Sequence, residues 1–173
     1  FNAVEEARKR DTLVVENPGE ANARLSYPLD CVSVAHIHQE QFSHPDNIFF
    51  LTMDASGEFP PVNKISGDAV RRFFETGYTS QMPGTEAGNE EIKKIFSPCY
   101  GSPFMPRPVK VYSDMLMDKI TNEVCNVYLI NTGMDTTGKR FSLDFTRKCV
   151  KSSIDIGIAD NSKEVLKILD GLL

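Results

Sequence analysis

The segment VYLINTGMDTTGKRFSLDFTRK, residues 127–148, has the most suggestive chemical pattern in the chain. An apolar run leads into Gly133, and Gly138 and Lys139 follow after four intervening residues. A phosphate-binding P-loop has the pattern G-x-x-x-x-G-K-[ST] between a strand and a helix, and its backbone N–H groups surround the phosphates of a nucleotide. The segment matches every position but the last, where Arg140 stands in place of serine or threonine.

Two features of this segment argue against a working P-loop. Arg140 cannot supply the hydroxyl that a P-loop uses to bind Mg²⁺. Ser142 is the best helix cap nearby and comes two residues too late for the first-turn N–H groups to converge on phosphates. The residues alone therefore leave open a glycine-rich turn between a strand and a helix, with Lys139 and Arg140 as exposed cations.

Histidine and cysteine side chains are the other groups that could do chemistry. His36 and His38 would share one face of a strand, and His44 follows, but no acidic or cysteine partner has a metal-ligand spacing. We therefore expect no metal site. The cysteines form no C-x-x-C pair, so we expect free buried thiols in a reducing compartment. They are Cys31, Cys99, Cys125 and Cys149.

Composition limits the class of protein. The 173 residues suffice for one domain, and the hydrophobic and charged fractions of 40% and 25% are ordinary for a globular protein. A net charge of −5 argues against general nucleic-acid binding but allows a local cationic site for a small anion. No apolar run reaches the ~20 residues that span a bilayer. Since the chain begins with Phe1 and no signal-peptide core, we expect a processed protein or a piece of a longer one.

Three runs of β-forming residues, at 12–17, 47–53 and 125–131, predict strands. The second and third runs are continuously apolar, which is typical of strands covered on both faces. We expect residues 48–52 and 127–130 to be central strands of one sheet.

Helical signals follow these strands. Ser66 and Ser142 are candidate N-caps of helices that end at Gly77 and near Gly157, with another helix over 108–122. A last helix is expected from Asn161 or Ser162, and residues 1–10 could form a short exposed one. The expected buried faces are Ala69, Val70, Phe73 and Phe74, then Tyr112, Met115, Leu116 and Ile120, then Leu143, Thr146, Val150 and Ile154.

Strands that alternate with helices predict an α/β fold. In open α/β sheets, ligands bind beyond the carboxyl ends of the strands. The candidate ligand loops are therefore residues 54–61 and 131–140. Residues 97–108, with four prolines, are expected to form a stiff irregular loop between helices.

Five blocks of the sequence together resemble the ATP-dependent phosphoenolpyruvate carboxykinase family. They are NARLSYPLD (22–30), NIFFLTMDASGEFPPVNKIS (47–66), GYTSQMPGTEAG (77–88), FSPCYGSPF (96–104) and VYLINTGMDTTGKRFSLDFTR (127–147), in the family's order and spacing. The resemblance covers most of residues 11–155, and none is seen over 158–173. It implies an α/β domain with a mixed sheet and flanking helices, like part of the family's C-terminal, nucleotide-binding domain, and we expect residues 1–173 to form this single, partial domain.

The resemblance also assigns roles to individual residues. The segment TGKRFSLDFT resembles the adenine side of the family's nucleotide site, which implies that Arg140 brackets the base, Phe141 contacts it and Thr146 borders the same pocket. Arg24, in the NARLSYP block, would reach the γ-phosphate as a catalytic residue. A guanidinium suits both roles because it is planar and permanently charged, so it can stack on a base or fork onto phosphate oxygens.

Several parts of the family pattern are not among these residues. The P-loop, the metal ligands and the substrate-binding N-terminal domain are missing, so we expect no metal site in this chain, weak or absent ATP binding, and no turnover by the chain alone. Within the matching blocks, Gln81 and Ala87 replace a lysine and an arginine, and Met134 replaces a tryptophan.

Three hypotheses follow from the resemblance. The favoured one is a catalytically inactive carboxykinase-like domain that serves as a structural or interaction subunit, with other protein subunits as partners and no nucleic acid. The alternative is a fragment of an active enzyme that converts oxaloacetate and ATP to phosphoenolpyruvate, ADP and CO₂ in gluconeogenesis. The third is a module that binds adenine nucleotides weakly. For all three we expect an intracellular location, mitochondrial or cytoplasmic.

Overall fold

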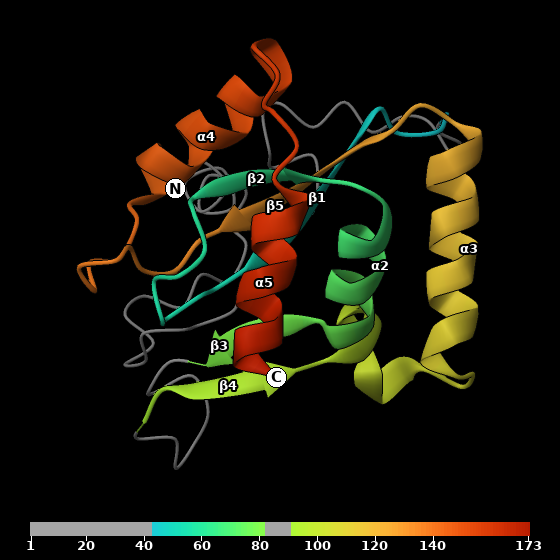
Figure 1. Ribbon diagram of the computed structural model, residues 1–173, viewed down its shortest axis with the longest axis horizontal. Coiled ribbons are helices and arrows are strands. Elements are labelled where there is room, and N and C mark those ends of the chain that lie inside the picture. Colours follow the sequence, from blue (N-terminus) through green and yellow to red (C-terminus); the bar gives the residue numbers. More distant parts are fainter. Residues whose placement is uncertain (1–42, 82–90) are drawn as a thin grey trace, which may run out of the picture. The chain divides into compact units, whose positions relative to one another are not determined.

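The computed structural model describes residues 43–81 and 91–173 (Figure 1). In chain order the strands and helices are β1 (Asn47–Thr52), β2 (Val62–Ile65), α2 (Gly67–Thr76), β3 (Tyr78–Gln81), β4 (Lys93–Phe96), α3 (Val109–Asn122), β5 (Asn126–Asn131), α4 (Leu143–Asp155) and α5 (Ser162–Leu172). Two short 3₁₀ turns, Pro98–Tyr100 and Ser102–Phe104, lie in the proline-rich segment that precedes α3.

The main sheet has the strand order β1-β5-β2. β1 runs parallel to β5, with Ile48 opposite Val127, and β2 runs antiparallel to β5, with Val62 opposite Ile130. β3 and β4 form a separate antiparallel pair. The mixed sheet with flanking helices confirms the α/β fold class that the sequence predicts.

The two apolar strands differ in their positions. β5 is central as predicted, and Val127 through Asn131 are buried. β1 is an edge strand among the described residues, where β5 is its one neighbouring strand, and Leu51 is 58% exposed. Among the described residues the central position is thus confirmed for β5, whereas β1 lies at the edge of the sheet with most of its side chains half-buried or buried.

The core lies on one face of the sheet. Successive residues of a strand point to opposite faces, and Val127 and Leu129 belong to the same buried cluster as the apolar side chains of α2 and α5. On the other face, the Tyr128 hydroxyl donates to the Ser153 carbonyl of α4 at 3.1 Å. The sheet is thus covered by α2 and α5 on one side and by α4 on the other (Figure 1).

The helix ends follow the sequence signals closely. Gly77 ends α2 in the left-handed conformation, with φ of 55° and its N–H bonded to the Phe73 carbonyl. Ser142 caps α4 by accepting a hydrogen bond from the Phe145 N–H at 3.2 Å. Ser66 precedes α2 as predicted, but its side chain makes no capping hydrogen bond.

Two predicted helix faces are partly wrong. In α3, Met115 is 52% exposed, because the helix instead turns Ser113 toward α2, where its hydroxyl donates to Glu75 at 2.5 Å. In α4, Leu143 and Ile154 are 60% and 53% exposed. The residues of α4 that face the sheet or lie half-buried are Thr146, Cys149, Val150 and Ser153.

Some sequence predictions concern residues outside the described part of the chain. These include the strand at 12–17, the helix at 1–10, and the residues Arg24, Cys31, His36 and His38. Across residues 43–81 and 91–173, no helix is both long enough and apolar enough to cross a membrane.

Candidate nucleotide-binding site

The two predicted ligand loops lie against each other. Because β1 and β5 are parallel neighbours, the loops that follow them leave the sheet at the same edge. The first loop joins β1 to β2, and the second joins β5 to α4. We call them the first and second site loops, residues 53–61 and 132–142.

Glycine allows the two loops to touch at two points. A Cβ on Gly133 would lie 2.1 Å from the Asp54 carbonyl oxygen, and a Cβ on Gly57 would lie 2.2 Å from the Asp135 carbonyl oxygen. Gly57 also has a φ of 74°, which a residue with a side chain rarely adopts. The backbones of the two loops are therefore closer together than any other residue at these positions would permit.

Asp54 holds the first site loop in shape. Its fully buried carboxylate accepts hydrogen bonds from the Ser56 N–H at 3.0 Å, the Ser56 hydroxyl at 2.7 Å and the Phe59 N–H at 3.0 Å. The Tyr78 hydroxyl donates a fourth bond at 3.0 Å. Burial, together with the nearby Asp54 charge, raises the pKa of Tyr78 to about 12, so this donor stays protonated at neutral pH.

Asp135 closes the second site loop into a tight turn. Its carboxylate accepts hydrogen bonds from the Thr137 N–H at 2.8 Å, the Thr137 hydroxyl at 2.6 Å and the Lys139 N–H at 3.0 Å, and its carbonyl accepts from the Gly138 N–H at 2.9 Å. The Thr137 hydroxyl and the Lys139 N–H hold the pKa of Asp135 below its usual value. The Asp135 carboxylate is therefore ionised at neutral pH and keeps its hydrogen bonds to Thr137 and Lys139.

This turn answers the question raised by the P-loop pattern. A P-loop needs free backbone N–H groups that point at phosphates, but those of Thr137, Gly138 and Lys139 are bonded within the turn to Asp135. The Asp135 carboxylate would also repel a phosphate. The segment is a strand-to-helix connection rather than a phosphate cradle.

A cavity of about 210 Å³ lies where the second site loop enters α4. We call it the nucleotide pocket, after the role that the resemblance implies for its residues. Its lining residues are Thr132, Arg140, Phe141, Leu143 and Thr146. The structure thus brings together all three residues that the resemblance assigns to the base, Arg140, Phe141 and Thr146, whereas Arg24 lies outside the described residues.

Local contacts position the walls of the nucleotide pocket. Phe141 stacks on Phe145 of α4, with ring centroids 5.3 Å apart, so its ring is supported from the helix. The Thr146 N–H bonds to the Ser142 carbonyl at 3.0 Å in the first turn of α4. Arg140 is exposed, so its guanidinium can close over a flat ligand from the solvent side.

Sequence reasoning did not assign Thr132 and Leu143 to this pocket. Thr132 directly follows β5, and its hydroxyl donates to the Thr52 carbonyl at 3.1 Å. The sequence predicts Leu143 on the buried face of its helix, whereas it lines the pocket and is largely exposed. Leu143 directly follows the cap residue Ser142. This position beside a ligand loop is the sequence signal that could have assigned Leu143 to the pocket.

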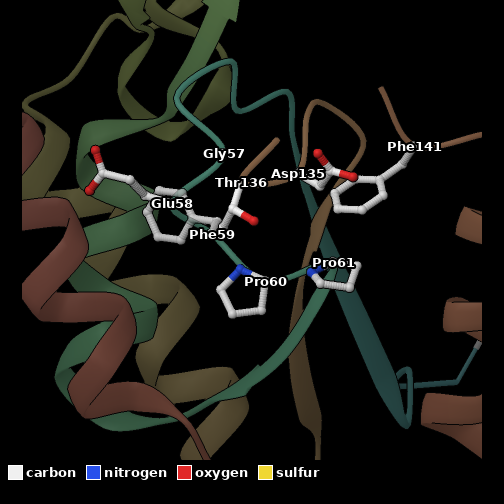
Figure 2. A pocket seen from close by; sticks show the side chains of 8 residues that line it. All are labelled: Gly57, Glu58, Phe59, Pro60, Pro61, Asp135, Thr136 and Phe141. Carbon is white, nitrogen blue, oxygen red and sulfur yellow. The ribbon is translucent and has the colours of Figure 1, made fainter. Parts of the chain in front are cut away.

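A second cavity of about 250 Å³ lies between the two site loops. Figure 2 shows Pro60 and Pro61 of the first loop facing Thr136 and Phe141 of the second. Its lining residues include the acidic Glu58 and Asp135 and no cationic residue, so it is unsuited to phosphates. Phe141 lines both cavities and separates the nucleotide pocket from this one.

Other candidate groups in the described part of the chain are dispersed. Cys99, Cys125 and Cys149 are free and half-buried rather than fully buried, and burial raises the pKa of each thiol. Within residues 43–81 and 91–173, no three His, Cys, Asp or Glu side chains converge in a way that could hold a metal ion.

The pocket of about 210 Å³ and the two interlocked loops beside it belong to a chain that is similar to known proteins. A comparison with protein families matches residues 2–170 to the family described as phosphoenolpyruvate carboxykinase. The chain belongs to the ATP-dependent phosphoenolpyruvate carboxykinase family. The match runs through nearly all of α5, which packs into the core with Val165, Ile168 and Leu169.

Individual carboxykinases support the same conclusion. The chain is 39% identical over 153 residues to the phosphoenolpyruvate carboxykinase (ATP) of Campylobacter jejuni strain RM1221, which covers 86% of this chain and 29% of that protein. It is 41% identical over 155 residues to that of Saccharomyces cerevisiae, covering 86% and 28%. For Lysinibacillus sphaericus the identity is 40% over 138 residues, covering 78% and 26%. The chain therefore spans under a third of the length of these carboxykinases.

Proposed function

We propose that this chain is part of an active ATP-dependent phosphoenolpyruvate carboxykinase, in which it provides the adenine side of the nucleotide site. The observation that carries the proposal is the nucleotide pocket, which gathers Arg140, Phe141 and Thr146 from a loop and a helix into one cavity. In this proposal Phe141 and Arg140 contact the faces of the base, and Thr146 borders its edge.

The chemistry of the pocket fits a base better than a phosphate. Its walls combine one aromatic ring, one aliphatic side chain and two hydroxyls with a single cation. A stack of a base on an aromatic ring or guanidinium contributes ~1–3 kcal/mol. Because association itself is costly, we expect this wall alone to bind ATP in the millimolar range or weaker.

The comparisons favour a fragment of an active enzyme over the inactive subunit that the sequence drift suggested. The chain is about 40% identical to carboxykinases named as ATP-dependent enzymes, and the match covers most of its length. The replacements at Gln81 and Ala87 are compatible with variation among active enzymes.

The remaining parts of the same polypeptide are then the proposed partners of this chain. Two large apolar side chains at the C-terminal end of α4 are exposed, namely Ile154 and Ile156. Exposed apolar side chains gathered on one helix are typical of a surface that another part of the protein covers. Phosphate binding, metal binding and oxaloacetate binding are assigned to those remaining parts.

The test is a turnover assay on the polypeptide in which this sequence occurs, with oxaloacetate, ATP and Mg²⁺ or Mn²⁺. We expect phosphoenolpyruvate formation. Arg140→Ala should raise the KM for ATP with a smaller effect on kcat, because it removes binding to the base, and Arg24→Ala should lower kcat, because it removes charge stabilisation at the transferred phosphoryl group. A native polypeptide of this length only, with no turnover, would contradict the proposal.

A further inference from the structure

Asn131, the last residue of β5, occupies the point where the two site loops meet. Its side chain is 1% exposed and uses its full hydrogen-bonding capacity. Its amide nitrogen donates to the carbonyls of Phe59 at 2.8 Å and Met134 at 3.2 Å. Its amide oxygen accepts from the N–H groups of Asp54 at 3.1 Å and Gly133 at 2.8 Å.

These four bonds divide evenly between the two site loops. Asp54 and Phe59 belong to the first loop, and Gly133 and Met134 belong to the second. A primary carboxamide offers two donors and two acceptor lone pairs, whereas a carboxylate only accepts and a hydroxyl has a single donor. The site therefore needs an amide side chain of this length, and not merely a polar one.

The backbone of the second loop carries this restraint to the nucleotide pocket. Gly133 accepts a hydrogen bond from the Phe141 N–H at 2.9 Å, and Met134 lies opposite Arg140 in an antiparallel bridge. Asn131 thus bonds to Gly133 and Met134, and the backbones of these two residues pair with Phe141 and Arg140 of the pocket.

We propose that Asn131 is a positioning residue of the nucleotide pocket, fixing Arg140 and Phe141 through the second site loop. The identity of the ligand, ATP, rests on the proposed function. The positioning role of Asn131 rests on its hydrogen bonds alone. Removal of the two donated bonds leaves the buried carbonyl of Phe59 and the half-buried carbonyl of Met134 without this partner, so the loops should separate.

The chain offers a matched control in Asn63 of β2. Asn63 is also 1% exposed, donates to the Pro60 carbonyl at 3.1 Å and accepts from the Asn161 side chain at 2.8 Å. Its side chain makes no bond to the second site loop. Asn131→Asp and Asn63→Asp are the same chemical change at the same burial, and only the first breaks the link between the loops.

The experiment compares both variants in the complete carboxykinase polypeptide by hydrogen exchange with mass spectrometry, without nucleotide. For Asn131→Asp we expect faster exchange, by roughly 10-fold, in peptides covering both site loops. For Asn63→Asp we expect faster exchange in the first loop and around Asn161, but not in the second loop. If either variant does not fold, Asn131→Ser and Asn63→Ser make the same comparison without burying a charge.

An ATP titration then gives the functional result. We expect Asn131→Asp to weaken ATP binding roughly 10-fold and Asn63→Asp to change it less than about 2-fold. Equal effects of the two variants on second-loop exchange and on ATP affinity would overturn the positioning role. Wild-type polypeptide that fails to bind ATP would instead refute the proposed function, while the exchange comparison would still decide whether Asn131 positions the loop.

Discussion

Replacement of Gly133 by alanine tests whether the two site loops must touch. The new Cβ would lie 2.1 Å from the Asp54 carbonyl oxygen and 2.5 Å from its nitrogen. Both atoms are backbone, so no flexible side chain can move aside. The loops would have to separate by roughly 1 Å to restore an ordinary carbon–oxygen contact.

That separation has a calculable cost. It would break or stretch the hydrogen bond from the Met134 N–H to the Asp54 carbonyl, now 2.8 Å, and that from the Asp54 N–H to Asn131, now 3.1 Å. Each bond contributes about 1 kcal/mol, and overpacking of a tight site adds ~1–3 kcal/mol, for a total of roughly 3–5 kcal/mol. For a chain of this size the melting temperature should fall by roughly 6–20 °C.

Two other glycines provide controls. Gly171 lies in α5 and a Cβ there would meet no atom within 4 Å, so Gly171→Ala should be neutral or stabilising by up to ~1 kcal/mol. Gly138 is equally open but has a φ of 76°, so Gly138→Ala should cost about 1 kcal/mol through backbone strain alone. The assay is urea unfolding followed by circular dichroism, because the chain has no tryptophan. If Gly133→Ala costs no more than Gly138→Ala, the close approach of the loops is wrong.

Two further predictions concern the supports of the site. Because the pKa of Tyr78 is raised to about 12 by burial, its contribution to stability should be constant below pH 10 and should be lost as pH rises from about 10 to 12. The difference in phenolate absorbance between wild type and Tyr78→Phe, which removes the hydrogen bond to Asp54, should show one phenol with a midpoint near pH 12; a midpoint near pH 10 for that difference would contradict this. Ser142→Ala removes the cap of α4, because the Phe145 N–H loses its acceptor. The free energy of unfolding should fall by about 1 kcal/mol in a urea titration. Ser152→Ala, on the exposed face of α4, is the control and should change the free energy of unfolding less. Equal losses for the two serines would argue against the cap.

The sheet and the helix ends could be read from the sequence because they depend on local chemistry. The apolar run of β5 indicates a strand buried on both faces, and Gly77 and Ser142 mark helix ends through backbone conformation and a single side-chain bond. These signals need no knowledge of distant residues.

The inner face of α3 could not be read in the same way. The ion pair between Arg71 and Asp114, at 2.5 Å, and the bond from Ser113 to Glu75 fix how α3 rotates against α2. Both contacts join residues about 40 positions apart, so they cannot be seen in the sequence of α3 alone. A pattern of apolar residues on α3 therefore predicts Met115 on the buried face, where the structure places Ser113.

The family resemblance groups Arg140, Phe141 and Thr146, which line one cavity, whereas the pattern of glycines alone is misleading. The spacing of Gly133, Gly138 and Lys139 suggests a P-loop, but Asp135 captures the N–H groups that a phosphate would need. An aspartate before Thr137 and Gly138 is itself a turn signal. It is the local clue that distinguishes this turn from a phosphate loop. Nothing local reveals that Asn131 joins the two site loops, since its partners are up to 77 residues away.

The most direct test of the adenine-side role is calorimetric titration of ATP into the complete carboxykinase polypeptide, comparing Arg140→Ala with Arg107→Ala. Arg107 is an exposed arginine before α3 and lines neither cavity, so its replacement removes the same charge elsewhere. A lost stack of ~1–3 kcal/mol predicts that Arg140→Ala weakens ATP binding by roughly 5- to 150-fold. Arg107→Ala should change it less than about 2-fold. Equal dissociation constants for the two variants would contradict the assignment of the pocket to the base.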